Sequence, residues 1–402
     1  MAVDTDIAAA DTEQAPGGLL RRVEDVVGAL PGPWREAFAG VPRHAFLPDV
    51  IWLRTADGLG HERVVRGEDP ARWWDAAYAD VPVVVQVRDG MPWEAGQTPW
   101  PSSSVSQPSI VAATLLALEP AVGDTVLEIG TGAGWNAGLL AHRLGGDRVV
   151  TVEVDPVLAA SASGRLEALD LRPRVVTGDG EQGWAPGGPY RRIVCTCSVT
   201  RVPSAWLQQT VPGGRIVTPW ATAWAAWGTL RLDVDDDGTA RGRFGPGGAF
   251  MAMRGHRSPV TDVADVVRPD HRPDTSITTL SPWAVAGGDR HDEAVMGLLL
   301  PGLWTHWNDE PDESGVRSRL WVGDDAGTSW ASVDYDGHQL DTFRVRRHGP
   351  RRVWDEVETA WGWWNEHGRP AFDTFGLDIH PDGKQRVWCD KTPGATWAVP
   401  RH

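Results

Sequence analysis

The fold of this 402-residue chain is indicated most strongly by the stretch Asp124-Thr-Val-Leu-Glu-Ile-Gly-Thr-Gly-Ala-Gly-Trp-Asn136. Its apolar run, residues 126–129, is typical of a buried strand, and Gly130, Gly132 and Gly134 follow directly before a helical pattern. Glycines at such a strand-to-helix turn let the backbone approach a nucleotide-like ligand that a Cβ would keep away. A glycine run alone is often only a turn, so a second feature is needed to support binding.

An acidic residue supplies that second feature. The next predicted strand, residues 148–154, places Glu153 near its carboxyl end, about twenty residues beyond the glycines. An acidic side chain there is the usual acceptor for the two hydroxyls of a ribose. Glu153 and the glycines together predict a nucleotide-binding strand–turn–helix unit.

The spacing of the glycines separates two classes of cofactor. A dinucleotide fold has Gly-x-Gly-x-x-Gly and holds pyrophosphate at the helix amino terminus. Here the turn is Gly-x-Gly-x-Gly and Glu128 precedes it, so a carboxylate lies where it would repel pyrophosphate and suit a cationic ligand. Asp179 and Gly180 follow the predicted strand 173–177, where a carboxylate can reach an adenine amine. These features predict S-adenosylmethionine as the cofactor.

Composition excludes several classes of protein. The formal net charge of −16 argues against nucleic acid as a partner, because phosphate binding needs basic patches. No apolar run is long enough for a membrane span, and the acidic amino terminus does not resemble a signal peptide, so we expect a cytoplasmic protein. The chain has 3 cysteines, which predict neither a disulfide framework nor a zinc site. Cys195 and Cys197 are interpreted as core residues of one strand, and no metal is expected.

Strand-like and helix-like segments alternate from residue 124 to residue 218. This alternation predicts an α/β fold, a Rossmann-like parallel sheet with helices on both faces. With S-adenosylmethionine as the predicted cofactor, such a sheet would be that of a class I methyltransferase. A hairpin is expected within residues 226–250. The predicted strands are 124–129, 148–154, 173–177, 191–197 and 213–218, and the predicted helices are 109–118, 135–144, 156–170 and 204–210.

Four regions are expected along the chain. Residues 1–18 are predicted to be disordered, 19–257 to form the methyltransferase domain, 258–275 to be a linker, and 276–402 to form a smaller Trp-rich α+β domain. In that last region a helix is expected near 351–367. Two interpretations of its Trp-rich face stay open: core packing, or recognition of a peptide. That face comprises Trp354, Val357, Trp361 and Trp364.

Six segments carry a family resemblance by occurring in a fixed order. They are Val41-Pro-Arg-His-Ala-Phe-Leu-Pro48, Ala77-Tyr-Ala-Asp80, Ser104-Val-Ser-Gln-Pro108, Val126-Leu-Glu-Ile-Gly-Thr-Gly-Ala-Gly-Trp135, Gly178-Asp-Gly180 and Pro212-Gly-Gly-Arg215. Together they resemble the protein-L-isoaspartate O-methyltransferase family over about residues 19–255. Such enzymes transfer a methyl group from S-adenosylmethionine to a carboxylate of isoaspartate or a related aspartyl residue.

The resemblance implies a role for each matching residue. Ser106 would be the catalytic-site hydroxyl beside the accepting carboxylate, although it could also cap the helix that begins near Pro108. Ser104 and Trp100 would contact the substrate. Arg43 and His44 could contact the substrate or serve packing. The cofactor would be bound by Glu128, Gly130, Gly132 and Gly134 at its methionine end, by Glu153 at the ribose, and by Asp179 and Gly180 at the adenine.

Two departures from the family pattern leave three functions open. A Pro-Trp-Pro-Ser-Ser insertion separates Gly96-Gln-Thr98 from Ser106, and about 145 residues follow the family region. Extended variants resemble enzymes that tailor ribosomally made peptides such as lanthipeptides, lasso peptides and graspetides, so methylation of a cyclised peptide's aspartyl side chain, leading to aspartimide, is the leading hypothesis. Repair of isoaspartyl residues in damaged proteins is the first alternative. A non-catalytic scaffold that binds S-adenosylmethionine is the second.

Overall fold

The computed structural model of the chain describes residues 15–92, 99–260, 262–311 and 315–400. It divides into two compact units. Unit 1 takes the described residues up to Cys197 and Pro203–Val217, and unit 2 takes Ser198–Val202 and the described residues from Thr218 onward. This division differs from the predicted linker at 258–275. The reason is that strands on both sides of that segment pair with each other, so the irregular composition there marks a connection inside unit 2.

A parallel sheet in unit 1 confirms the alternating pattern of the sequence. Its order is β7-β6-β5-β8-β9, and every neighbouring pair is parallel. All four residues of the central strand β5 are buried, which explains its continuous apolar run. The strands are β5 (Val126–Ile129), β6 (Val149–Glu153), β7 (Arg174–Thr177), β8 (Tyr190–Cys195) and β9 (Thr210–Pro219).

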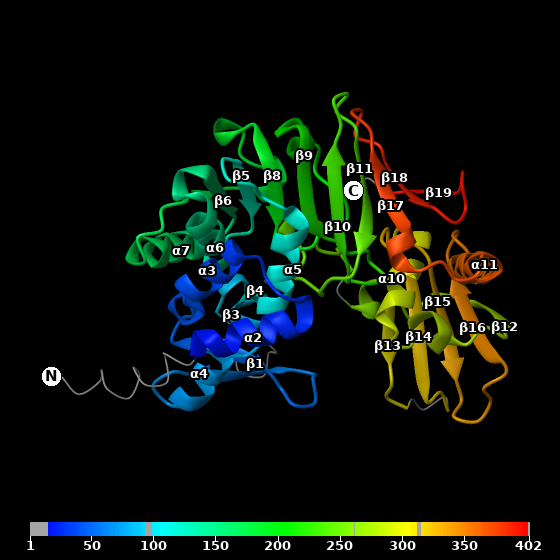
Figure 1. Ribbon diagram of the computed structural model, residues 1–402. Coiled ribbons are helices and arrows are strands. Elements are labelled where there is room, and N and C mark those ends of the chain that lie inside the picture. Colours follow the sequence, from blue (N-terminus) through cyan, green and yellow to red (C-terminus); the bar gives the residue numbers. More distant parts are fainter. Residues whose placement is uncertain (1–14, 93–98, 261, 312–314, 401–402) are drawn as a thin grey trace. The chain divides into compact units, whose positions relative to one another are not determined.

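Helices follow the strands where the sequence predicts them. Helix α6 packs against β6, and α7 packs against β6 and β7 (Figure 1). Proline occupies the first turn of α5 and α7, where its missing N–H costs nothing. The Asp155 side chain caps α7 by accepting from the backbone N–H groups of Val157 and Leu158. The helices are α5 (Pro108–Leu118), α6 (Trp135–Leu144), α7 (Pro156–Ala168) and α8 (Ser204–Gln208).

The amino-terminal part of unit 1 is more regular than the sequence suggests. Helix α2 begins at Ala15, inside the segment predicted to be disordered. Four strands between residues 50 and 105 form an antiparallel sheet of order β2-β1-β3-β4. Its strands are short and its β3–β4 register shifts, so the period-two pattern is weak. The elements are α2 (Ala15–Val27), α3 (Gly32–Gly40), α4 (Pro70–Tyr78), β1 (Val50–Arg54), β2 (His61–Val65), β3 (Val83–Val87) and β4 (Pro101–Val105).

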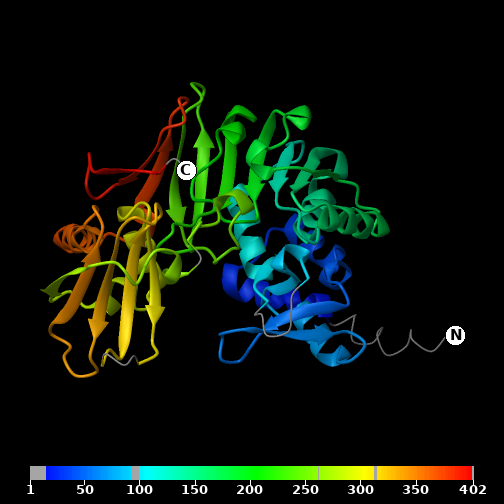
Figure 2. The ribbon, with the colours of Figure 1, turned by 180° about the vertical axis from the view of Figure 1, so that it is seen from behind.

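Unit 2 contains two groups of antiparallel strands. One has the order β19-β18-β17-β11-β10 and includes the predicted hairpin, and the other is a five-stranded sheet of order β12-β16-β15-β14-β13, yellow-green to orange in Figures 1 and 2. The first comprises β10 (Thr229–Val234), β11 (Ala240–Gly245), β17 (Phe375–Ile379), β18 (Gln385–Cys389) and β19 (Thr396–Ala398). The second comprises β12 (Asp274–Thr278), β13 (Leu303–Asn308), β14 (Ser318–Asp324), β15 (Trp330–Tyr335) and β16 (Phe343–His348). The helices of this unit are α9 (Pro282–Ala286), α10 (Arg290–Leu299) and α11 (Val353–Glu366).

Helix α11 decides between the two interpretations of the Trp-rich face. It packs against β14, β15 and β16. Trp354, Val357 and Trp364 are buried, and the half-buried Trp361 lies beneath the Arg369 guanidinium at 4.7 Å. Core packing is therefore confirmed for three of the four side chains.

Three further observations bear on composition. Within the described ranges, no helix is both long and apolar enough to cross a bilayer. The same residues contain no cluster of three or more His, Cys, Asp and Glu side chains that could hold a metal ion. Strand β8 ends at Cys195, so Cys197 lies beyond the strand on which both cysteines were predicted; Cys195 is buried and Cys197 half-buried.

Candidate active site

The glycine turn, residues 130–134, adopts backbone conformations that need glycine. The φ angles of Gly130, Gly132 and Gly134 are 92°, 54° and 98°. A Cβ on Gly130 would lie 2.6 Å from the Thr196 hydroxyl oxygen, and one on Gly134 would lie 3.2 Å from the Ala162 Cβ. The turn therefore brings bare backbone close to the neighbouring side chains of the protein, which explains why glycine is needed at these positions.

The segment predicted to bind substrate passes beside this turn. A Cβ on Gly132 would lie 3.4 Å from the Ser103 hydroxyl oxygen and 3.8 Å from the Ser104 carbonyl oxygen of β4. The neighbouring strand β3 is also tied to the cofactor side, because Gln86 Nε2 donates to Asp155 Oδ2 at 2.9 Å. Residues from β4 and the glycine turn are thus brought together within unit 1.

Glu153 lies at the carboxyl end of β6 and supports the turn directly. Its carboxylate accepts from the backbone N–H of Gly132 at 2.8 Å and from that of Asp155 at 3.0 Å. The side chain is 7% exposed. A carboxylate offers about four lone-pair positions, so it can accept from ribose hydroxyls as well as from backbone N–H groups.

Glu128 lies behind the turn rather than lining it. It is fully buried, and its two carboxylate oxygens accept from Thr151 Oγ1 at 2.5 Å and Asn136 Nδ2 at 2.7 Å. Burial raises the pKa of Glu128 to about 7, the two hydrogen bonds lower it, and the charge of Glu153 raises it further. The resemblance implies that Glu128 contacts the methionine end of the cofactor, and that contact stays a prediction for a side chain that is fully buried beside the turn.

Asp179 and Gly180 follow β7, the strand next to β6. Asp179 is exposed, and its side chain accepts from the Glu181 backbone N–H at 3.0 Å, which fixes the start of a short 3-10 helix. The Gly180 carbonyl oxygen accepts from the indole N–H of buried Trp206 at 2.8 Å. The Asp179 carboxylate keeps acceptor capacity toward solvent, as the predicted adenine contact needs.

Arg43 fixes the backbone that precedes α5. Its guanidinium is fully buried, and burial lowers the pKa of Arg43 to about 9. The sequence left open whether Arg43 binds substrate or serves packing, and the structure gives it a packing role. Its N–H groups donate to the backbone carbonyl oxygens of Ala76, Ala77, Ala79, Val81, Val105 and Ser106 at 2.8 to 3.3 Å.

Ser106 is half-buried and held by this contact through its own carbonyl group. It does not cap α5, because the N-cap residue is Gln107 and makes no side-chain cap. The backbone N–H of Ser109, in the first turn of α5, donates instead to Asp80 Oδ1 at 2.8 Å. Asp80 thus caps the first turn of α5 from a distant part of the sequence, in place of Ser106. The Ser106 hydroxyl stays available to a ligand.

The inserted Pro-Trp-Pro-Ser-Ser segment lies partly in a strand. Pro101–Val105 forms strand β4 and pairs with β3, and Ser102 Oγ donates to Gln86 Oε1 at 2.9 Å. Trp100, directly before β4, is 39% exposed, and Ser104 is half-buried. Gly96-Gln-Thr98 lies outside the described residues.

Sequence reasoning missed Thr151, Asn136 and Asp80. Asn136 follows the last glycine by two residues and Thr151 precedes Glu153 by two, so both lie on the predicted elements and face the site by simple spacing. Asp80 is the last residue of the quoted Ala77–Asp80 segment. His44 bonds to the Tyr78 hydroxyl through Nδ1 at 2.5 Å, and burial lowers the pKa of His44.

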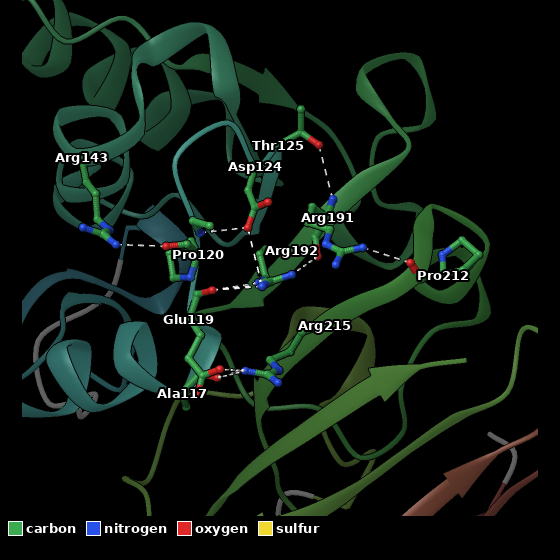
Figure 3. A network of polar contacts seen from close by, with 11 residues as sticks. Ala117, Glu119, Pro120, Asp124, Thr125, Arg143, Arg191, Arg192, Pro212 and Arg215 are labelled. Atoms are coloured by element: carbon green, nitrogen blue, oxygen red, sulfur yellow. Dashed lines mark hydrogen bonds and ion pairs between the residues drawn. The ribbon is translucent and has the colours of Figure 1, made fainter. Parts of the chain in front are cut away.

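The opposite end of the same sheet carries a different polar cluster, the amino-end network (Figure 3). Arg192 donates to the Glu119 carbonyl oxygen at 3.0 Å and lies 3.6 Å from Asp124 Oδ2. Arg215 Nη1 pairs with Glu119 Oε2 at 2.6 Å, and Arg191 Nη1 donates to the Pro212 carbonyl oxygen at 3.1 Å. The arginines of this network therefore form hydrogen bonds and ion pairs within the protein.

Comparison with known proteins gives consistent results. Residues 63–237 match the family model described as protein-L-isoaspartate(D-aspartate) O-methyltransferase. The chain is 33% identical over 214 residues to the protein-L-isoaspartate O-methyltransferase of Thermococcus onnurineus, covering 52% of this chain and 94% of that protein. It is 40% identical over 186 residues to the enzyme of that name from Ignicoccus hospitalis, covering 46% of this chain and 71% of that protein.

A solved structure shows that the likeness in fold extends further. A protein-L-isoaspartate O-methyltransferase superimposes with a TM-score of 0.51 and 19% sequence identity, covering 93% of this chain and 99% of that chain. Unit 1 takes only about half of the residues, so the matched region includes much of unit 2.

Proposed function

This chain belongs to the protein-L-isoaspartate O-methyltransferase family, and on that premise we propose that it methylates the α-carboxylate of isoaspartyl residues in proteins or peptides. It is an S-adenosylmethionine-dependent carboxyl O-methyltransferase. This choice reverses the order of the hypotheses drawn from the sequence, in which tailoring of a cyclised peptide came first. The reason is that both relatives compared above are protein-L-isoaspartate O-methyltransferases.

The observation that carries the proposal is the passage of β4 beside the glycine turn. The Ser104 carbonyl oxygen lies within contact distance of a Cβ position on Gly132, so an acceptor bound along β4–Ser106 would meet a cofactor bound on the turn. The residues present also fit the cofactor, because Glu153 and Asp179 offer carboxylate oxygens as acceptors for its hydroxyl and amine groups.

The chemistry asks little of the protein beyond positioning. When bound, S-adenosylmethionine supplies an electrophilic methyl group on a sulfonium. A carboxylate has an ordinary pKa of about 4 and is already ionised at neutral pH, so no general base is required. The Ser106 hydroxyl would donate to one carboxylate oxygen and leave the other oxygen aimed at the methyl group. Arg43 keeps the Ser106 backbone in place for that purpose.

A second candidate function rests on the rebuilt segment before Ser106. Part of the inserted segment, Pro101 to Ser103, belongs to strand β4, so the acceptor side of this site departs from the family pattern. That side of the site could present an aspartyl side chain of a cyclised ribosomal peptide instead of isoaspartate. The methyl ester would then lose methanol as the next backbone nitrogen attacks, leaving an aspartimide. Peptide recognition by residues 276–402 stays a prediction attached to this candidate.

One assay separates the candidates. Transfer of labelled methyl from S-adenosylmethionine is measured with a linear isoaspartyl peptide, the same peptide with normal aspartate, and a cyclised aspartyl peptide. Label on the isoaspartyl peptide alone supports the proposal. Label on the cyclised peptide alone, followed by net loss of one water, would replace it with the tailoring function. No transfer to any peptide, with cofactor still bound, would leave the scaffold hypothesis.

A further inference from the structure

Glu128 is a buried carboxylate whose charge is not balanced by a cation. Its partners are a hydroxyl and an amide, and within the described part of the chain no arginine, lysine or histidine pairs with it. Burying an uncompensated charge costs stability, so such a group is a candidate for a functional role. The neighbouring strand β8 presents the apolar Val194 to Glu128, and helix α6 presents Asn136.

The hydrogen bonds around Glu128 have a defined direction. Thr151 has one hydroxyl proton, and the 2.5 Å contact from its Oγ1 to Glu128 Oε2 uses it when Glu128 is ionised. Thr131 Oγ1 lies 2.6 Å from Thr151 Oγ1, so Thr131 must then be the donor in that pair. Donors thus converge on Glu128 from the glycine turn through two threonines and from α6 through Asn136.

We propose that Thr131, Thr151 and Asn136 hold Glu128 as an anion behind the glycine turn, and that this anion makes the site favour the sulfonium cofactor over its neutral thioether product. The inference rests on the proposed function, because it assumes S-adenosylmethionine at the turn. Thr151 and Asn136 are positioning residues in this account, since they act through Glu128.

The balance of effects on Glu128 makes its charge responsive to a ligand. Desolvation and the charge of Glu153 oppose ionisation, while the Thr151 and Asn136 hydrogen bonds favour it, and the resulting pKa is about 7. Glu153 is the charged side chain acting on Glu128 among the described residues. A sulfonium near the turn would favour the ionised form and lower this pKa, whereas a thioether would not. The ratio of the two affinities should therefore rise as pH rises through about 7.

The test is calorimetric titration of the full chain with S-adenosylmethionine and with S-adenosylhomocysteine. Glu128→Gln and Thr151→Val should each weaken binding of the sulfonium about tenfold, the change equivalent to one unit of pKa, with thioether affinity nearly unchanged. Thr151→Ser should restore the wild-type values. Thr114→Val, which removes another buried hydroxyl that bonds only within α5, is the matched control.

The pH series extends from about 5.5 to about 7.5, below the range in which α-amino groups lose their proton. The wild-type affinity ratio should rise over this range, and that of Glu128→Gln should be flat. Thermal melts of each variant confirm folding, and Thr151→Val keeps the test valid if Glu128→Gln does not fold. The inference would be overturned if the variants bound both ligands more weakly by the same factor, or if the affinity ratio of the wild type did not change with pH. Failure of the wild type to bind either ligand would overturn the proposed function itself.

Discussion

The two ends of the parallel sheet in unit 1 use charge in opposite ways. At the amino ends of the strands, Arg192 and Arg215 are matched by Asp124 and by the carbonyl and carboxylate oxygens of Glu119. At the carboxyl ends, Glu128 is buried with neutral donors only, among the residues that the structure describes. The first arrangement stabilises the fold, and the second lowers stability in exchange for affinity toward a cation. Substitutions at each end should therefore have separable effects on folding and on binding.

The largest effect is expected from the pH dependence of stability without cofactor. The pKa of Glu128 is raised from 4.5 to about 7, so between these values the folded protein holds a proton that the unfolded chain has released. The contribution of Glu128 to the free energy of unfolding therefore falls as pH rises through this window, by about 3 kcal/mol in total. Urea unfolding of the wild type and Glu128→Gln at several pH values measures the difference. Parallel pH curves for the two proteins would contradict the prediction.

Replacement of Glu153 should next show that the carboxyl end is the binding end. Glu153→Ala removes the acceptor proposed for two ribose hydroxyls and the partner of the Gly132 N–H. Charge-assisted hydrogen bonds contribute roughly 1.5–3 kcal/mol each, so affinity for S-adenosylmethionine should fall about 100-fold or more. Calorimetric titration measures it. Glu119→Ala, a carboxylate removed from the amino end, is the matched control and should leave affinity unchanged. Unchanged affinity in Glu153→Ala would remove the ribose assignment.

Ser106→Ala should separate binding of the acceptor from binding of the cofactor at the carboxyl end of the sheet. The hydroxyl is proposed to touch the acceptor and not the cofactor, so kcat/KM for an isoaspartyl peptide should fall about tenfold, in line with the loss of one hydrogen bond to a charged group. Affinity for S-adenosylmethionine should stay at the wild-type value. Ser102→Ala, which removes a hydroxyl of β4 that bonds to Gln86 of β3, separates this effect from a general disturbance of β4. Full activity in Ser106→Ala would end its catalytic-site role.

The smallest effect is expected at the amino end. Arg192→Met keeps the apolar stem of a side chain that is 13% exposed and removes its bonds to the Glu119 carbonyl oxygen and to Asp124. The free energy of unfolding should fall by about 1–2 kcal/mol, while methyl transfer and cofactor affinity remain unchanged. Urea unfolding and the labelled-methyl assay give both quantities. A loss of cofactor affinity in this variant would mean that the two ends are coupled and the comparison is wrong.

The sequence predicts the carboxyl end of the sheet far better than the distant residues that hold the site in place. Residues 124–153 carry a strand, a glycine turn and an acidic strand end in one continuous stretch, so local pattern suffices there. Arg43 could not be placed, because its carbonyl partners lie 33 to 63 residues away and backbone acceptors leave no trace in the sequence. The boundary between the units escaped for the same reason. Strand β11 pairs with β17, more than 130 residues later, and neither segment carries a composition that reveals the pairing.

The assignment of Ser198–Val202 to unit 2 has a consequence for dissecting this protein. The chain leaves unit 1 after Cys197, returns at Pro203 and leaves again after Val217, so it passes between the units three times. Within unit 2, the Gln385 side chain accepts from the Val202 N–H at 3.0 Å and donates to the Val202 carbonyl oxygen at 2.6 Å. A truncation after residue 217 would strand those backbone groups without their partner, and a graft of unit 2 onto another enzyme would lack its first five residues. A dissection of the two units therefore has to keep residues 198–202 together with residues 218–402.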